Sequence, residues 1–153
     1  MVGTPHVPAG ILELSFDWLE YLSLATKLAA SDDEASQRSA ISRAYYSLYI
    51  TARRRLELSG VQIKGDQHRA VWDAYRSRSN PGQSPDECGR IAMRANTLKW
   101  RRVRADYEDD YPGISSEVQD QLQQASRLLE QLRQIPQERI PTPQEVEGAR
   151  LHR

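Results

Sequence analysis

Cysteine, histidine and lysine are scarce in this chain of 153 residues, which has one cysteine and three histidines. The single cysteine, Cys88, excludes an intrachain disulfide and is typical of a reducing compartment. His6, His68 and His152 never approach Cys88 or one another at the spacing of metal ligands. We therefore expect no disulfide framework, no metal centre and no cofactor.

Long apolar runs, glycine-rich loops and an excess of charge of one sign are also absent. The most apolar stretch, residues 11–30, is interrupted by Glu13, Asp17, Glu20 and Lys27, which excludes a membrane span and a signal-peptide core. The formal net charge is zero, so no overall attraction to nucleic acid or anionic membranes exists. These properties predict one soluble, cytoplasmic domain without a membrane partner.

Apolar residues recur at helical spacing through most of the sequence, and nothing indicates a substantial strand. Two of these stripes, which we expect to be buried, consist of Ile41, Tyr45, Leu48, Ala52 and Leu56, and of Cys88, Ile91, Ala95, Leu98 and Ala105. This pattern predicts an all-α fold, an antiparallel bundle of four to five helices. We expect four long helices and a short one between the second and third of them. They are predicted over residues 11–29, 32–59, 68–79 (the short one), 85 to about 110, and 115–135.

The bundle domain is predicted to cover residues 11–134. Residues 1–10 are interpreted as a flexible N-terminus. Residues 135–153 are polar and contain several prolines, so we expect a partly disordered tail with little to bury. A short helix is compatible with the "TPQE" segment at residues 142–145.

Two serines that precede a glutamate by three residues predict helix starts. Ser31 with Glu34, and Ser84 with Glu87, have the spacing of a capping box. Pro85 would then occupy the first position of the helix, where proline is favoured. The predicted N-caps are therefore Ser31 and Ser84.

Arg102 lies on the apolar stripe of the helix predicted from residue 85 to about 110, where an apolar residue is expected. Asp106 follows one turn later, at a spacing where the two side chains can meet. The two residues could form a buried ion pair that fixes the register of the bundle. Alternatively, Arg102 could bind a phosphate. The nearby Lys99, Arg101 and Arg104 slightly favour phosphate binding.

Arg43 and Tyr46 share one side of the second helix, at the edge of its apolar stripe. They could be a solvated flank or part of a site. His68, at the start of the short helix, would usually be a capping or surface residue. Trp72 and Tyr75 on the same helix are most simply core residues.

Two segments resemble motifs of the HEPN superfamily of small helical bundles: "SRAYYSLY" at residues 42–49 and "RRVRADYEDDY" at residues 101–111. "HRAVWDAY" lies between them and "ISSEV" follows, in the order found in stand-alone bacterial members. The resemblance covers residues 11–134. It implies a homodimer that acts on RNA or a nucleotide, typically as a metal-independent endoribonuclease of a toxin–antitoxin or phage-defence system. A partner nucleotidyltransferase or another defence-system protein is also implied.

The ribonuclease members are similar in an arginine followed after four to six residues by histidine, and no histidine here has an arginine at that distance. The general base is therefore left open among Asp106, Tyr107 and His68, and catalysis itself is also left open. The alternative is a non-catalytic bundle that binds a nucleotide, RNA or another protein. The residues that the resemblance places at the site are Arg102, Asp106, Tyr107 and His68 for catalysis, and Arg43, Tyr46, Arg101 and Arg104 for substrate binding.

Overall fold

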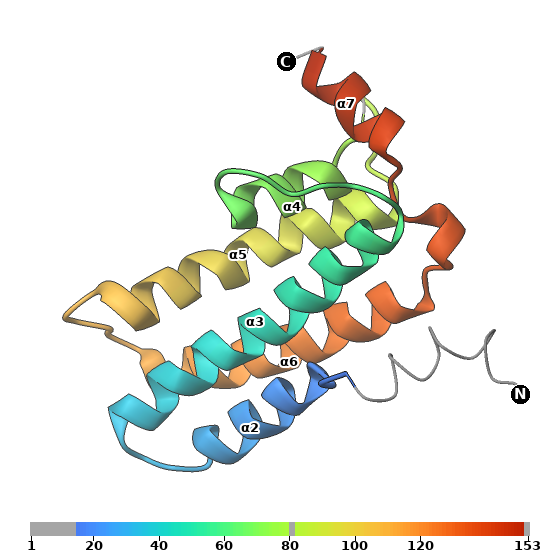
Figure 1. Ribbon diagram of the computed structural model, residues 1–153. Helices are drawn as coiled ribbons and strands as arrows, with labels where there is room; N and C mark the ends of the chain where they lie inside the picture. Colours follow the sequence, from blue (N-terminus) through green and yellow to red (C-terminus); the bar gives the residue numbers. More distant parts are fainter. Residues whose placement is uncertain (1–14, 80–81, 152–153) are drawn as a thin grey trace, which may run out of the picture.

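The computed structural model describes residues 15–79 and 82–151, and every regular element within them is helical. The helices pack as a bundle, which confirms the predicted all-α class (Figure 1). In this part of the chain no helix is long and apolar enough to cross a membrane. The elements are α2 (Leu19–Ala29), α3 (Glu34–Leu58), α4 (Gln67–Tyr75), α5 (Glu87–Tyr107), α6 (Ile114–Gln134), the 3-10 helix η2 (Gln137–Arg139) and α7 (Pro143–Leu151).

Helix α3 is the centre of the bundle. It packs against α2, α4, α5 and α6, and α2 and α5 lie on opposite sides of it (Figure 1). Because neighbours surround it, α3 buries more than one face, and alanines on it allow close helix packing. The predicted stripe is confirmed by the full burial of Ile41, Tyr45, Leu48, Ala52 and Leu56.

Aspartates, rather than the predicted serines, cap the N-termini of α3 and α5. The Asp33 carboxylate accepts from the backbone N–H of Ser36, and the Asp86 carboxylate accepts from that of Gly89. The predictions of Ser31 and Ser84 as N-caps are therefore wrong. A charged carboxylate next to the helix start accepts a stronger hydrogen bond than a hydroxyl two residues further away. The Ser31 hydroxyl instead donates to Asp33. The hydrogen bonds that Asp33 accepts from Ser31 and from the backbone N–H of Ser36 lower its pKa to about 2.

Two arginines of α3 cap the C-termini of other helices. Arg38 donates to the backbone carbonyls of Ala105 and Glu108 at the end of α5. Arg55 donates to the backbone carbonyl of Leu132 at the end of α6. The last carbonyls of a helix have no partner within it and carry partial negative charge. Arg38 and Arg55 therefore have a structural role, as caps that join α3 to the ends of α5 and α6.

Replacing Arg55 with methionine is expected to lower the free energy of unfolding by about 1–3 kcal/mol, because buried carbonyls at the end of α6 lose their donor. The matched control is Arg54→Met, since Arg54 forms an ion pair with Glu57 at the surface and its replacement should change stability by less than about 0.5 kcal/mol. Urea denaturation of both variants measures the difference. Equal effects would contradict a capping role for Arg55.

The segment after α6 is packed against the bundle, unlike the tail expected there. Ile135 and Ile140 are buried, and Gln137 donates to the backbone carbonyl of Arg55. Thr142 and Glu145 form a reciprocal capping box at the start of α7, so the short helix at "TPQE" is present. The predicted flexible residues 1–10 lie outside the described residues.

Candidate functional site

Arg102 and His68 meet between α5 and α4. Arg102 Nη2 lies 3.2 Å from His68 Nε2, although 34 residues separate the two along the chain. Arg102 has only 7% of its surface exposed, as its place on the α5 stripe predicts, whereas His68 is half-buried. The structure therefore brings a histidine of α4 next to Arg102 of α5, a contact that no spacing along the chain indicates.

The contacts of His68 determine which ring nitrogen carries the proton. An arginine side chain can only donate, so Nε2 accepts and Nδ1 bears the hydrogen. Nδ1 lies 2.9 Å from the hydroxyl oxygen of Tyr45, which also accepts from Trp72 Nε1 at 3.1 Å. The ring of Tyr49 stacks on His68 at 4.2 Å between centroids. These contacts hold the imidazole with its Nε2 lone pair towards Arg102.

The imidazole of His68 is neutral at physiological pH. Burial lowers its pKa to about 4, and the positive charge of Arg102 acts in the same direction. The negative charge of Asp66 opposes this shift of the His68 pKa, while the positive charges of Lys99 and Arg53 add to it. A neutral imidazole with a defined lone pair is the form that can accept a proton.

The guanidinium of Arg102 is incompletely satisfied. Its Nη1 is 3.7 Å from Asp106, longer than a good hydrogen bond, and its buried Nε has no hydrogen-bond partner among the described residues. The Asp106 carboxylate also accepts from the Ser42 hydroxyl at 3.2 Å. The ring centroids of Tyr45 and Tyr46 lie 5.7 and 5.2 Å from the guanidinium carbon. Arg102 is thus held in place by aromatic rings while it retains capacity to donate.

Arg43 and Tyr46 lie at the edge of this cluster. The Arg43 guanidinium is 5.0 Å from the ring of Tyr21 and 5.8 Å from that of Tyr46. Tyr46 in turn contacts the ring of His68 edge-on. Both predicted substrate-binding residues of α3 are therefore connected to the Arg102–His68 pair.

The remaining predicted residues lie apart from the pair. Arg101 pairs with Asp120 of α6 at 2.8 Å, and Arg104 pairs with Glu108 at 3.0 Å. The Tyr107 side chain is 74% exposed. The structure therefore brings together His68, Arg102, Asp106, Tyr46 and Arg43, and leaves Arg101, Arg104 and Tyr107 outside the cluster.

Sequence reasoning missed the residues that orient His68. Tyr45 and Trp72 were assigned to the core, which is correct for their burial, but their polar atoms also bond to the site. One available indication was the spacing of four between His68 and Trp72, and between Tyr45 and Tyr49, which places each pair on one helix face. Which faces meet depends on how α3 and α4 pack.

Comparisons of the chain with models of known families, with curated proteins and with solved structures give no match. Among the described residues, no three histidine, cysteine, aspartate or glutamate side chains are grouped to hold a metal ion. What the site can do therefore follows from its own residues. A neutral base beside a partly unsatisfied guanidinium can take a proton from a hydroxyl while the cation faces an anionic oxygen.

NMR titration of the His68 ring is expected to give a midpoint well below the usual 6.5, near the pKa of about 4. Arg102→Gln should raise the midpoint, because it removes a positive charge but leaves the burial. The unfolded chain binds this proton more tightly than the folded one, so His68 costs stability as the pH falls from about 6.5 to 4. Arg69→Gln, a change at an exposed arginine of the same helix, should leave the midpoint unchanged. A wild-type midpoint near 6.5 would contradict this electrostatic description.

Proposed function

We propose that this chain is a HEPN-type protein that binds and cleaves RNA without a metal ion. The observation that carries the proposal is the 3.2 Å contact between Arg102 and His68. In the ribonucleases that the sequence resembles, arginine and histidine come from one motif. Here α4 would supply the histidine and α5 the arginine.

In this proposal His68 is the general base and Arg102 stabilises charge on the phosphate. The 2′-hydroxyl of a nucleotide donates its proton to Nε2 of His68 as its oxygen attacks the adjacent phosphorus. Arg102 turns its N–H groups from the imidazole to a phosphate oxygen, where negative charge develops. The bond from phosphorus to the 5′-oxygen breaks, and that oxygen takes a proton from water. The products are a 2′,3′-cyclic phosphate and a 5′-hydroxyl.

Of the three candidate bases, His68 is the best supported. Asp106 already accepts from Ser42 and pairs with Arg102, which suits a positioning role. Tyr107 is exposed and outside the cluster. The proton bound to Nε2 would be stabilised by the anionic phosphate, so substrate binding should raise the pKa of His68 and make it a stronger base.

The alternative is a purely structural Arg102–Asp106 pair that fixes the bundle. The separation of 3.7 Å and the unpartnered Nε make this contact weaker than a dedicated buried ion pair would be. A bundle that binds RNA without cutting it would use the same arginine. An assay, and not the geometry of the site, therefore distinguishes RNA cleavage from RNA binding alone.

The test is an assay on mixed cellular RNA in EDTA. Wild type should generate fragments with 2′,3′-cyclic phosphate ends, and Arg102→Ala should lose both cleavage and most RNA affinity. Arg104→Ala, two residues along α5 from Arg102 and ion-paired with Glu108, is the matched control and should retain activity. RNA binding that depends on Arg102 without fragments would establish a recognition module. An absence of both from folded protein would overturn the proposal.

The same preparation tests self-association, which the HEPN resemblance implies. Met93, Trp100 and Tyr107 recur every seven residues on α5, so they share one face, and all three are largely exposed. This apolar face supports a proposed homodimer through α5. Light scattering should give the mass of two chains, and the mass of one chain would contradict it. A nucleotidyltransferase or other defence-system partner is proposed on the resemblance alone.

A further inference from the structure

Two cavities lie along the contact between α5 and α6, and Arg94 lines both. The first has a volume of about 300 Å³ and is also lined by Arg90 and Arg139. The second, of about 350 Å³, is also lined by Arg101 and Arg127. We call the two together the α5–α6 groove. Its α5 side extends over 15 residues, about 21 Å of helix.

The α5–α6 groove carries an excess of positive charge, although the whole chain has a formal net charge of zero. Five arginines and two acids line it, and both acids are already paired. Glu87 lies 2.7 Å from Arg139, and Asp120 lies 2.8 Å from Arg101. Three arginines of the groove make no ion pair within the described part of the chain: Arg90, Arg94 and Arg127.

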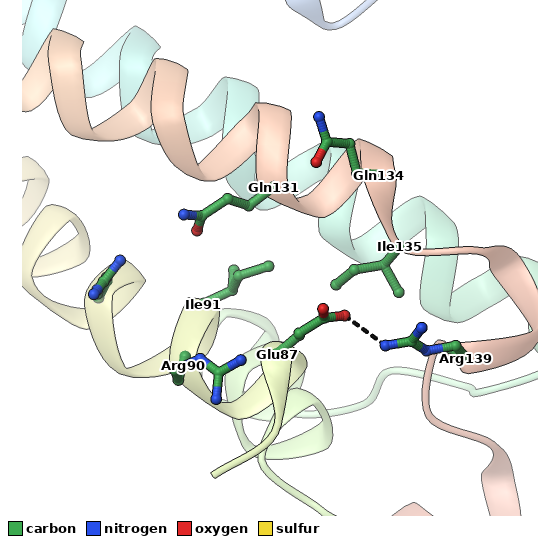
Figure 2. Close-up of a pocket in the computed structure, with 8 residues that line it drawn as sticks. Glu87, Arg90, Ile91, Gln131, Gln134, Ile135 and Arg139 are labelled. Carbon is green, nitrogen blue, oxygen red and sulfur yellow. Dashed lines mark hydrogen bonds and ion pairs between the residues drawn. The ribbon is translucent and has the colours of Figure 1, made fainter.

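The other lining groups are neutral. Figure 2 shows Ile91 and Ile135 pointing toward one another between the helices, and Gln131 and Gln134 of α6 also line the first cavity. The Glu87–Arg139 pair closes one end (Figure 2). Glutamine amides can hydrogen-bond to phosphate, sugar or base, and isoleucines provide an apolar surface for a sugar or base. The chemistry of this groove suits a phosphate-bearing chain with polar and apolar parts.

The groove and the Arg102–His68 pair lie on different sides of α5. Arg90, Arg94 and Arg101 are spaced by four and seven residues and so share a face that borders α6. Arg102 belongs to the buried stripe and contacts residues of α3 and α4. A ligand in the groove would therefore contact α5 without touching His68.

We propose that the α5–α6 groove binds the sugar–phosphate backbone of single-stranded RNA, a role that deepens the proposed function and rests on it. A crevice between two packed helices admits one strand, whereas a duplex would contact only its rim. The unpaired arginines neutralise successive phosphates and hold the strand to the protein. The groove is a binding site, and its arginines take no part in the cleavage step.

The experiment measures binding of a fluorescent 2′-O-methyl oligouridylate of 12 nucleotides by polarisation at several salt concentrations. The 2′-O-methyl group prevents cleavage, so the result does not depend on whether His68 is a base. Arg94→Gln with Arg127→Gln should weaken binding at least tenfold. It should also reduce the slope of log affinity against log salt by about 1.4, about 0.7 for each lost phosphate contact.

The matched control is Arg54→Gln with Arg69→Gln, which removes the same two charges from exposed, ion-paired arginines outside the groove. It should retain affinity within about twofold. Equal losses in the two double variants, or no loss in the groove variant, would overturn the proposal. Displacement of the oligonucleotide by equimolar inorganic tripolyphosphate would also overturn it, since the ligand would then be phosphate alone.

The failure of this proposal is distinguishable from that of the proposed function. Groove-dependent binding by a protein that does not cut unmodified RNA would refute only the cleavage proposal. Cleavage with an unchanged KM in the groove variant would refute only the groove. If both hold, the groove variant should raise KM with little change in kcat, because its arginines act on binding alone.

Discussion

Replacing His68 with alanine is expected to reduce the rate of RNA cleavage by about 10²–10⁴-fold, the usual contribution of a positioned general base. RNA affinity should change little, because Arg102 and the α5–α6 groove remain. The neighbouring Arg69→Ala is the control, since Arg69 is exposed on the same helix and its ion pair with Asp73 is long, at 3.5 Å. Cleavage rates are measured with excess enzyme on one labelled RNA.

The pH dependence provides a second measurement of the same prediction. Because the pKa of His68 is about 4 in the free protein, kcat/KM should stay nearly constant from pH 7 to about 5 and fall only below that. An ordinary histidine would produce the fall near pH 6.5. If His68→Ala still cleaved RNA at the wild-type rate, or kept the pH profile of the wild type, His68 would be excluded as the base. Asp106 would then be the remaining candidate in the cluster.

Truncating Ile140 to alanine is expected to lower the free energy of unfolding by about 2–5 kcal/mol, the usual cost of removing a fully buried isoleucine. Ile140 has no exposed surface, although it lies in the segment beyond α6. Leu151→Ala is the matched control because Leu151 is 74% exposed in the same segment, and its truncation should cost less than about 0.5 kcal/mol. Urea denaturation followed by circular dichroism measures both.

The Ile140 prediction tests whether the C-terminal segment is part of the folded domain. Ile140 belongs to the same core cluster as Leu56 and Leu132, so its loss should destabilise the whole bundle in one transition. A small effect, equal to that of Leu151→Ala, would show that the segment is not docked in solution. The hydrogen bonds of Gln137 to the Arg55 carbonyl and the Ser59 hydroxyl would then also be absent.

The two roles considered for Arg102 make opposite predictions for stability and affinity. A register pair predicts a lower melting temperature for Arg102→Ala and unchanged RNA binding, since Asp106 would lose its partner. A phosphate site predicts an intact fold and weaker binding. The buried, unpartnered Nε favours the second outcome, because removing it also removes an unsatisfied donor.

The sequence alone determined the helices and which of their faces are buried. The stripes through Ile41 to Leu56 on α3 and through Cys88 to Ala105 on α5 are buried as their spacing predicts, and Arg102 lies on the second stripe. Periodicity succeeds here because the face that a helix buries is encoded within that helix. The first residues of α3 and α5 were less well predicted, because Asp33 and Asp86, and not Ser31 and Ser84, cap the two helices.

Only the tertiary structure decided which polar groups meet. His68 and Arg102 come from helices whose relative position depends on packing around Tyr45 and Trp72, and no local spacing contains that information. Packing also explains why two neighbouring arginines of α3 have different partners: Arg55 caps α6, whereas Arg54 stays at the surface. Side chains one residue apart point in directions 100° apart on a helix, and their environments are set by the neighbouring helices that they face.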